Sequence, residues 1–211
     1  RVIGPVSLQI RRRSSSTALA QEIGLGLHGF GTLVYGLVLI GRFLDDESLS
    51  NDARNACHML DPVVIEEDQR LECFSGAAGF ILGLLSAIDL GDDVALCLAR
   101  SSADLLIRHR IVDAPSGHSA WPTHLGEPSV GFAHGCTGIA AALLEIHSRW
   151  RCQAYYDAAM EAFRFERLLF LPEVGDWPDI RNQAYPRLSG WCHGAPGVCF
   201  GRLASLRAID V

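Results

Sequence analysis

The stretch "GFAHGCTGIAAALL", residues 131–144, places two glycines three positions apart at the start of a long apolar run. Glycine lets backbones approach closely and accepts positive φ angles, so a pair of this kind marks a tight turn of the chain. The run that follows is apolar on nearly every side, as in a helix that is buried all round. The stretch therefore predicts a tight loop that leads into a buried helix.

The same pattern occurs four times along the chain. The other copies are "GLHGFGTLVYGLVLI" (residues 26–40), "CFSGAAGFILGLLSAI" (residues 73–88) and "WCHGAPGVCFGRLASL" (residues 191–206). The leading glycines are separated by 47, 59 and 59 residues, and Thr32 replaces the second glycine in the first copy. A period in this range is typical of arrays of supersecondary units. We expect buried helices to begin near Thr32, Ala78, Thr137 and Pro196, each after a loop on the same side.

Two intervening segments carry a different pattern. Residues 92–109 and 150–170 mix apolar and charged positions in the manner of amphipathic helices. Each unit then consists of one exposed helix and one buried helix, and strand signals are scarce. We expect an all-α fold, an incomplete α/α toroid (a double-layered helical barrel) whose glycine loops gather at one mouth. A solenoid of helix pairs is the alternative.

The ends of the sequence suggest a piece of a longer protein. We expect residues 1–23 to be a linker or the remnant of a preceding domain, and residues 24–211 to hold four repeats of a partial domain. One rival interpretation concerns residues 24–41, which are uncharged and lie downstream of a basic run at residues 11–13. That length and flank are typical of a membrane span. The repeat explains the same stretch as the first buried helix, so we expect no span.

The composition of the chain argues against some classes of function. The 211 residues carry a net charge of −6, with a pI near 5.7, which argues against a nucleic-acid surface. Seven cysteines form an odd count in a chain that is too large and too apolar to need a disulfide framework. We expect a reduced, cytoplasmic setting.

Candidate chemistry gathers just before the glycine pairs. If the loops share one mouth, a single space is lined by His28, Glu72, Ser75, His134, Cys192 and His193. Thiolate and imidazole are the ligands that zinc prefers, and Cys192 is a plausible ligand. His134 can act as a ligand or as an acid/base. We expect five of the cysteines outside this group to be small core residues: Cys57, Cys97, Cys136, Cys152 and Cys199.

Together with "WCHGAPGV" (residues 191–198) and "GDWPDIR" (residues 175–181), the stretch "GFAHGCTGIAAALL" resembles the cyclase domain of class II lanthipeptide synthetases, the LanC-like family. The two earlier glycine loops match in order. The resemblance implies an α/α toroid with a Zn²⁺ ion at its mouth. It also implies that a peptide cysteine adds to dehydroalanine or dehydrobutyrine to form a lanthionine or methyllanthionine ring. The implied partners are a dehydrated precursor peptide and an N-terminal dehydratase domain.

The resemblance also assigns roles to single residues. Cys192 matches a zinc ligand, and His134 matches the histidine that transfers a proton. Glu72 stands where the family often has aspartate, and His193 is an active-site neighbour; with His134 they make the catalytic candidates. The family's other two zinc ligands, a Cys-His pair in a later glycine loop, do not occur before Val211. We therefore expect this piece alone to bind zinc weakly and not to cyclise.

Two other functions stay open at this point. The same mouth could grip a peptide without chemistry, as a non-catalytic peptide-binding toroid, which would need no zinc. An unrelated α/α toroid could act on carbohydrate, a reaction that usually needs paired carboxylates. The second alternative ranks last because only Glu72 stands near the expected mouth.

Overall fold

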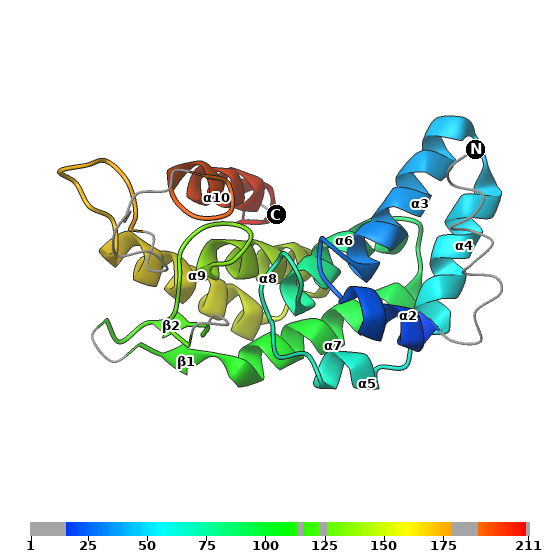
Figure 1. The fold of residues 1–211 in the computed structure, drawn as a ribbon, viewed down its shortest axis with the longest axis horizontal. Coiled ribbons are helices and arrows are strands. Elements are labelled where there is room, and N and C mark those ends of the chain that lie inside the picture. Colours follow the sequence, from blue (N-terminus) through cyan, green and yellow to red (C-terminus); the bar gives the residue numbers. More distant parts are fainter. Residues whose placement is uncertain (1–15, 114–115, 123–125, 179–189, 210–211) are drawn as a thin grey trace.

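The computed structural model of the chain describes residues 16–113, 116–122, 126–178 and 190–209 (Figure 1). The helices are α2 (Ser16–Ile23), α3 (Phe30–Leu44), α4 (Glu47–His58), α5 (Val63–Glu66), α6 (Ala77–Ile88), α7 (Asp93–His109), α8 (Cys136–Trp150), α9 (Gln153–Leu168) and α10 (Ala195–Ile209). Two short strands, β1 (Ile111–Val112) and β2 (Ser119–Ala120), pair in an antiparallel hairpin. The prediction of an all-α fold is confirmed.

The helices form two layers. In the inner layer, α3 packs against α6, α6 against α8, and α8 against α10. Outer helices α4, α7 and α9 each pack against the inner helix that precedes them in the chain, and also against one another. Figure 1 shows α3 and α10 at opposite ends of the inner row, with α6 and α8 between them. The alternation of buried and exposed helices therefore follows the repeat in the sequence.

The four inner helices begin within two residues of the predicted positions, at Phe30, Ala77, Cys136 and Ala195. The two central helices, α6 and α8, are well buried, whereas α3 and α10 are each buried on only one side. Helix α10 exposes a stripe formed by Phe200, Leu203 and Leu206, and α3 exposes another formed by Tyr35, Leu39 and Phe43. The expectation of a buried helix is thus met by α6 and α8 and is wrong for α3 and α10, because in the described part of the chain each of these two packs closely on only one other inner helix.

The second glycine of each pair lies against the backbone of its own loop. A Cβ atom added to Gly79, Gly138 or Gly197 would lie 1.8, 1.9 or 1.9 Å from the carbonyl oxygen of the residue six positions earlier. These oxygens belong to Cys73, Phe132 and Trp191. Hence no L side chain fits, and the loop can fold back over the first turn of the helix only if glycine is present. Thr32 in the first copy is exposed, and its hydroxyl donates to the carbonyl of Leu27.

Backbone hydrogen bonds join each glycine loop to the next. The donors and acceptors are Leu27 N to Cys73 O (2.9 Å), His28 N to Phe74 O (2.8 Å), Phe74 N to Ala133 O (3.0 Å) and Phe132 N to Trp191 O (3.3 Å). Because buried amide groups need partners, these bonds fix the order and spacing of the loops. The loops therefore lie in one row at the N-terminal ends of the inner helices.

Two aspartates anchor helix starts from a distance. The first N–H groups of a helix have no partner within the helix. Asp68 accepts a hydrogen bond from Ala77 N (2.7 Å) at the start of α6, and Asp176 accepts one from Ala195 N (2.9 Å) at the start of α10. Both aspartates lie too far upstream to be recognised as N-caps in the sequence, and the sequence analysis missed them.

Glu166 connects three helices inside the protein. This residue of α9 is fully buried, and its carboxylate accepts hydrogen bonds from the Thr137 hydroxyl on α8 and from Arg202 Nε (2.8 Å) on α10. Burial raises the pKa of Glu166 to about 7, although the charge of Arg202 and its hydrogen bond act in the opposite direction. A carboxyl group inside the fold therefore titrates near neutral pH.

The cysteines differ in their exposure to solvent. Cys57 and Cys136 are buried, as expected, but Cys97 and Cys199 are exposed and Cys152 is partly exposed. The expectation of core positions is wrong for these three. Cys97 faces outward from α7, Cys199 lies on α10, which is packed on one side only, and Cys152 precedes α9.

The candidate membrane stretch, residues 24–41, is divided between a loop and a helix. Residues 24–29 precede α3, which has 15 residues in all. Over the described ranges, no helix combines the length and the apolar character needed to cross a membrane.

Replacing Gly138 by alanine should destabilise the fold, because the new Cβ would overlap the carbonyl of Phe132. We expect a loss of about 2 kcal/mol in the free energy of unfolding, measured by urea denaturation. Gly36→Ala is the matched control, since a Cβ at this position of α3 meets no atom within 4 Å. It should stabilise the protein by up to about 1 kcal/mol. Equal effects of the two substitutions would refute the close-approach argument.

Glu166 should make stability depend on pH. Its pKa is raised in the folded state from 4.5 to about 7, so its contribution to stability is fully present below pH 4.5. That contribution declines up to about pH 7 and then stays constant, a change of about 3 kcal/mol. Glu166→Gln should therefore gain stability relative to wild type over this range, measured by denaturation at each pH. Glu161→Gln, on the same helix, should not reproduce the gain, and a difference independent of pH for Glu166→Gln would contradict the prediction.

Candidate functional site

The row of glycine loops borders a pocket of about 250 Å³ at the mouth. Its walls are formed by His28, Arg70, Glu72, Phe74, Ser75 and His134. These residues come from the loops before α3, α6 and α8. Four of the six candidates from the sequence therefore meet in one cavity, which we call the mouth pocket.

Glu72 and His134 form the central contact of the mouth pocket. His134 Nδ1 lies 3.1 Å from Glu72 Oε2. The two residues belong to neighbouring loops, and the backbone bond from Phe74 N to Ala133 O holds these loops side by side. The structure thus brings together two residues to which the family resemblance assigns catalysis.

The Glu72 carboxylate is held from several sides. It accepts hydrogen bonds from Phe74 N (2.7 Å), Ser75 N (2.9 Å) and the Ser75 hydroxyl (2.6 Å). Burial by itself would raise the pKa of Glu72, but the bonds from His134, Ser75 and Phe74, with the charge of His134, lower it overall. Glu72 therefore stays ionised at neutral pH. Because its carboxylate engages Nδ1 of His134, Nε2 is the ring nitrogen that can exchange a proton with a substrate.

Four rings follow one another along the mouth. The ring centroids of His28 and Phe74 are 5.0 Å apart, those of Phe74 and His134 are 5.2 Å apart, and those of His134 and His193 are 4.9 Å apart. His28 and Phe74 are exposed, His134 is partly exposed and His193 is buried. His193 thus packs behind His134, while the other two rings extend the row toward solvent.

Cys192 lies beside His193 in the loop before α10 and is partly exposed. Within the part of the chain that the structure describes, no group of three or more His, Cys, Asp or Glu side chains could hold a metal ion. A catalytic zinc needs three protein ligands. The described residues thus do not by themselves compose a zinc site, and the assignment of Cys192 as a ligand stays a prediction.

Arg70 is the site residue that the sequence analysis missed. Its side chain lines the mouth pocket two residues before Glu72. The sequence offered one signal, since an arginine close to a candidate catalytic carboxylate lies in the same loop. No pattern in the sequence showed that its side chain shares the cavity with His134.

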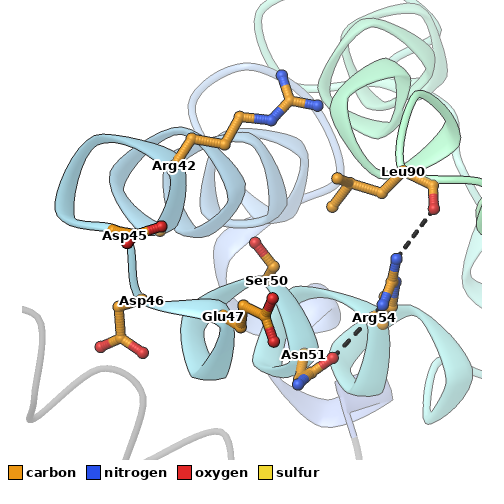
Figure 2. Close-up of a pocket in the computed structure, with 9 residues that line it drawn as sticks. Arg42, Asp45, Asp46, Glu47, Ser50, Asn51, Arg54 and Leu90 are labelled. Atoms are coloured by element: carbon orange, nitrogen blue, oxygen red, sulfur yellow. Dashed lines mark hydrogen bonds between the residues drawn. The ribbon is translucent and has the colours of Figure 1, made fainter.

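Another pocket lies at the opposite ends of the inner helices. Figure 2 shows it around the turn between α3 and α4, where Arg54 donates a hydrogen bond to the Leu90 carbonyl (2.9 Å). Its walls include Arg42, Asp45, Asp46 and Glu47 but no histidine or cysteine. The bond from Arg54 joins α4 to the α6–α7 turn, so this side chain of the pocket holds two elements of the fold together.

The comparisons with known proteins agree with this architecture. The family model described as lanthionine synthetase C-like protein matches residues 8–210. The chain belongs to this family. A comparison with curated proteins gives no significant match. The family match extends over α2 and part of the segment expected to be a linker, and the division of the chain at residue 23 stays a prediction.

One motif of the LanC-like chain is described only in part. Of the stretch at residues 175–181, residues 179–181 lie outside the described ranges. Within the described part, Asp176 anchors α10, and Trp177 Nε1 donates to the Glu166 carbonyl (2.8 Å). Of these two residues of the motif, Asp176 thus contacts α10 and Trp177 contacts α9.

Zinc should bind this chain weakly or not at all, because the described residues do not surround Cys192 with the further ligands that a catalytic ion needs. After dialysis against a mild chelator, we expect well below one zinc per chain by elemental analysis. Cys192→Ala should lower the amount of zinc that remains bound after dialysis. A longer protein that supplies a Cys-His pair in a later glycine loop should retain zinc, and the same substitution should abolish it there. Stoichiometric zinc in the 211-residue chain would contradict the ligand assignment.

Proposed function

We propose that this LanC-like domain promotes the addition of a thiol to dehydroalanine or dehydrobutyrine in a dehydrated precursor peptide. The product is the thioether of lanthionine or methyllanthionine. One observation carries the proposal: His134 is held 3.1 Å from the ionised Glu72 in the wall of a pocket that opens at the mouth. Membership of the LanC-like family supports the same reaction.

The reaction adds S–H across a carbon–carbon double bond. The thiolate forms a bond to the β-carbon, and the π electrons move toward the carbonyl group to give an enolate. The α-carbon then takes a proton, so no oxidant or reductant is needed. The enzyme must hold a proton donor over one face of the enolate, and a positioned histidine is the commonest such donor. We assign this task to His134, with Glu72 orienting its ring.

The thiolate is the second requirement. An ordinary cysteine has a pKa near 8.5 and is mostly protonated at neutral pH. The zinc ion that the family implies would supply thiolate when bound, with Cys192 among its ligands. Proton delivery at the α-carbon is thus the part of the reaction that the described residues can carry.

The two alternatives predict different chemistry at the mouth. A non-catalytic peptide-binding toroid would use the ring row and pocket to grip a peptide, without proton transfer. The carbohydrate alternative needs two carboxylates across the substrate. Among the residues that line the mouth pocket, Glu72 is the one carboxylate, and its oxygens already bind His134 and Ser75. The geometry therefore favours the thioether reaction over a glycosidase.

An external thiol allows a test that needs no metal. A peptide that contains one dehydroalanine is mixed at pH 7 with thiophenol, which is largely thiolate at this pH. Mass spectrometry follows the adduct, and chromatography separates its two α-carbon diastereomers. We expect the wild-type chain to accelerate the addition and to give one diastereomer in excess, because His134 protonates a single face.

Variants test whether His134 and Glu72 cause the acceleration and the diastereomer excess. His134→Ala should lower the rate about 10²-fold and remove the diastereomer excess. Glu72→Gln should weaken both to a smaller extent. His58→Ala is the matched control, since His58 also lies beside a carboxylate, 3.2 Å from Asp92, but far from the mouth pocket. Peptide binding without acceleration or diastereomer excess would support the non-catalytic alternative instead.

A further inference from the structure

Arg70 lies where two pockets meet. His28, Arg70 and Ser75 line both the mouth pocket and a second pocket of about 390 Å³. The second pocket has apolar walls that include Ala20, Leu25 and Val64, and acidic walls that include Glu22, Glu67 and Asp68. The two cavities therefore adjoin along Arg70, and a peptide that reacts in the mouth pocket has a path past this side chain.

The turn that carries Arg70 is fixed by its surroundings. Asp68 is buried, and its carboxylate accepts hydrogen bonds from Arg70 N (3.0 Å) and Leu71 N (3.2 Å), in addition to the bond from α6. Leu71 has a φ of 62°, a strained value for a residue with a branched side chain, and this side chain is buried. Such strain persists only where the structure enforces it. Arg70 and Glu72, on either side of Leu71, both line the mouth pocket.

The guanidinium group of Arg70 does not stabilise the fold in the described part of the chain. Its side chain is exposed and makes no hydrogen bond or ion pair with a described residue. Asp68 is engaged by backbone amides, and Glu72 by His134 and Ser75. Glu22 and Glu67 line the second pocket together with Arg70, but neither forms an ion pair with it. Among the residues lining the mouth pocket, Arg70 is also the one permanent cation. A rigid turn thus presents an unused guanidinium group to the cavity that holds His134.

We propose that Arg70 donates hydrogen bonds to the carbonyl oxygen of the dehydroamino acid during thiol addition. This inference rests on the function proposed above. As the C–S bond forms, the π electrons of the double bond move onto this oxygen, which becomes an enolate oxygen. A cation placed at developing negative charge stabilises the transition state. Afterwards the electron pair returns to the α-carbon, which takes its proton from His134, and the carbonyl is restored.

Arg70 and His134 should therefore have separable effects. Arg70 acts on the oxygen and affects the rate alone, whereas His134 acts on the α-carbon and affects both the rate and the configuration of the product. In the thiophenol assay, Arg70→Gln should lower the rate at saturating peptide about 10²-fold. It should keep the diastereomer excess of wild type, because His134 still protonates the same face. Damage to the whole site would remove both properties.

Two further variants sharpen the test. Arg70→Lys keeps the charge but loses the planar fork of donors, so its rate should fall between those of wild type and Arg70→Gln. Arg42→Gln removes an arginine at the opposite end of α3 (Figure 2) and should keep the wild-type rate. Thermal melting should give similar midpoints for all variants, since Arg70 makes no side-chain contact that holds the described fold.

The outcomes separate the two proposals. A wild-type rate for Arg70→Gln, with the wild-type chain active, would overturn the role of Arg70 and leave the proposed function intact. If the wild-type chain shows neither acceleration nor diastereomer excess, the proposed function fails. In that case, labelling of arginine side chains with phenylglyoxal, mapped by mass spectrometry, tests whether Arg70 contacts the peptide. Protection of Arg70 but not Arg42 by the dehydrated peptide would support its contact with the peptide, and equal labelling of both with and without peptide would overturn it.

Discussion

In three of the four glycine loops, the backbone folds back so closely over the next helix that a carbonyl oxygen occupies the place of a side chain. At Gly79, Gly138 and Gly197 a Cβ atom would lie within 2 Å of this oxygen. The close approach makes each loop compact, which allows its remaining amide and carbonyl groups to bond to the neighbouring loop. The row of loops and the alignment of the inner helices depend on this contact, and so does the meeting of residues from different repeats at the mouth.

The pKa values of two buried carboxyl groups are shifted in opposite directions, because their surroundings differ. Glu72 is surrounded by donors from His134, Ser75 and Phe74, and these lower its pKa despite burial. Glu166 is buried more completely, and its contact with Arg202 only partly offsets the cost of burying its charge, so its pKa rises to about 7. Thus the mouth holds a stable anion suited to orienting a histidine, while the interior holds a carboxyl group that links helix packing to pH.

The mouth also separates residues that hold the structure from residues available for chemistry. Asp68 is a structural residue, because its carboxylate fixes a strained turn and the start of α6. His134 and Arg70, by contrast, line the mouth pocket itself. Proton delivery and stabilisation of the enolate oxygen are distinct tasks in thiol addition, and we propose a different side chain for each.

The sequence by itself determined the positions and order of the inner helices, because apolar runs and glycine pairs are local patterns. It also marked His134 and Glu72 as candidates through the repeat and the family resemblance. Only the tertiary structure decided that these two side chains touch, that Arg70 shares their cavity, and that Asp68 and Asp176 anchor helices many residues downstream. Each of these contacts joins elements that are distant in the chain. Their formation depends on how whole helices and loops pack, and no local spacing of residues encodes that packing.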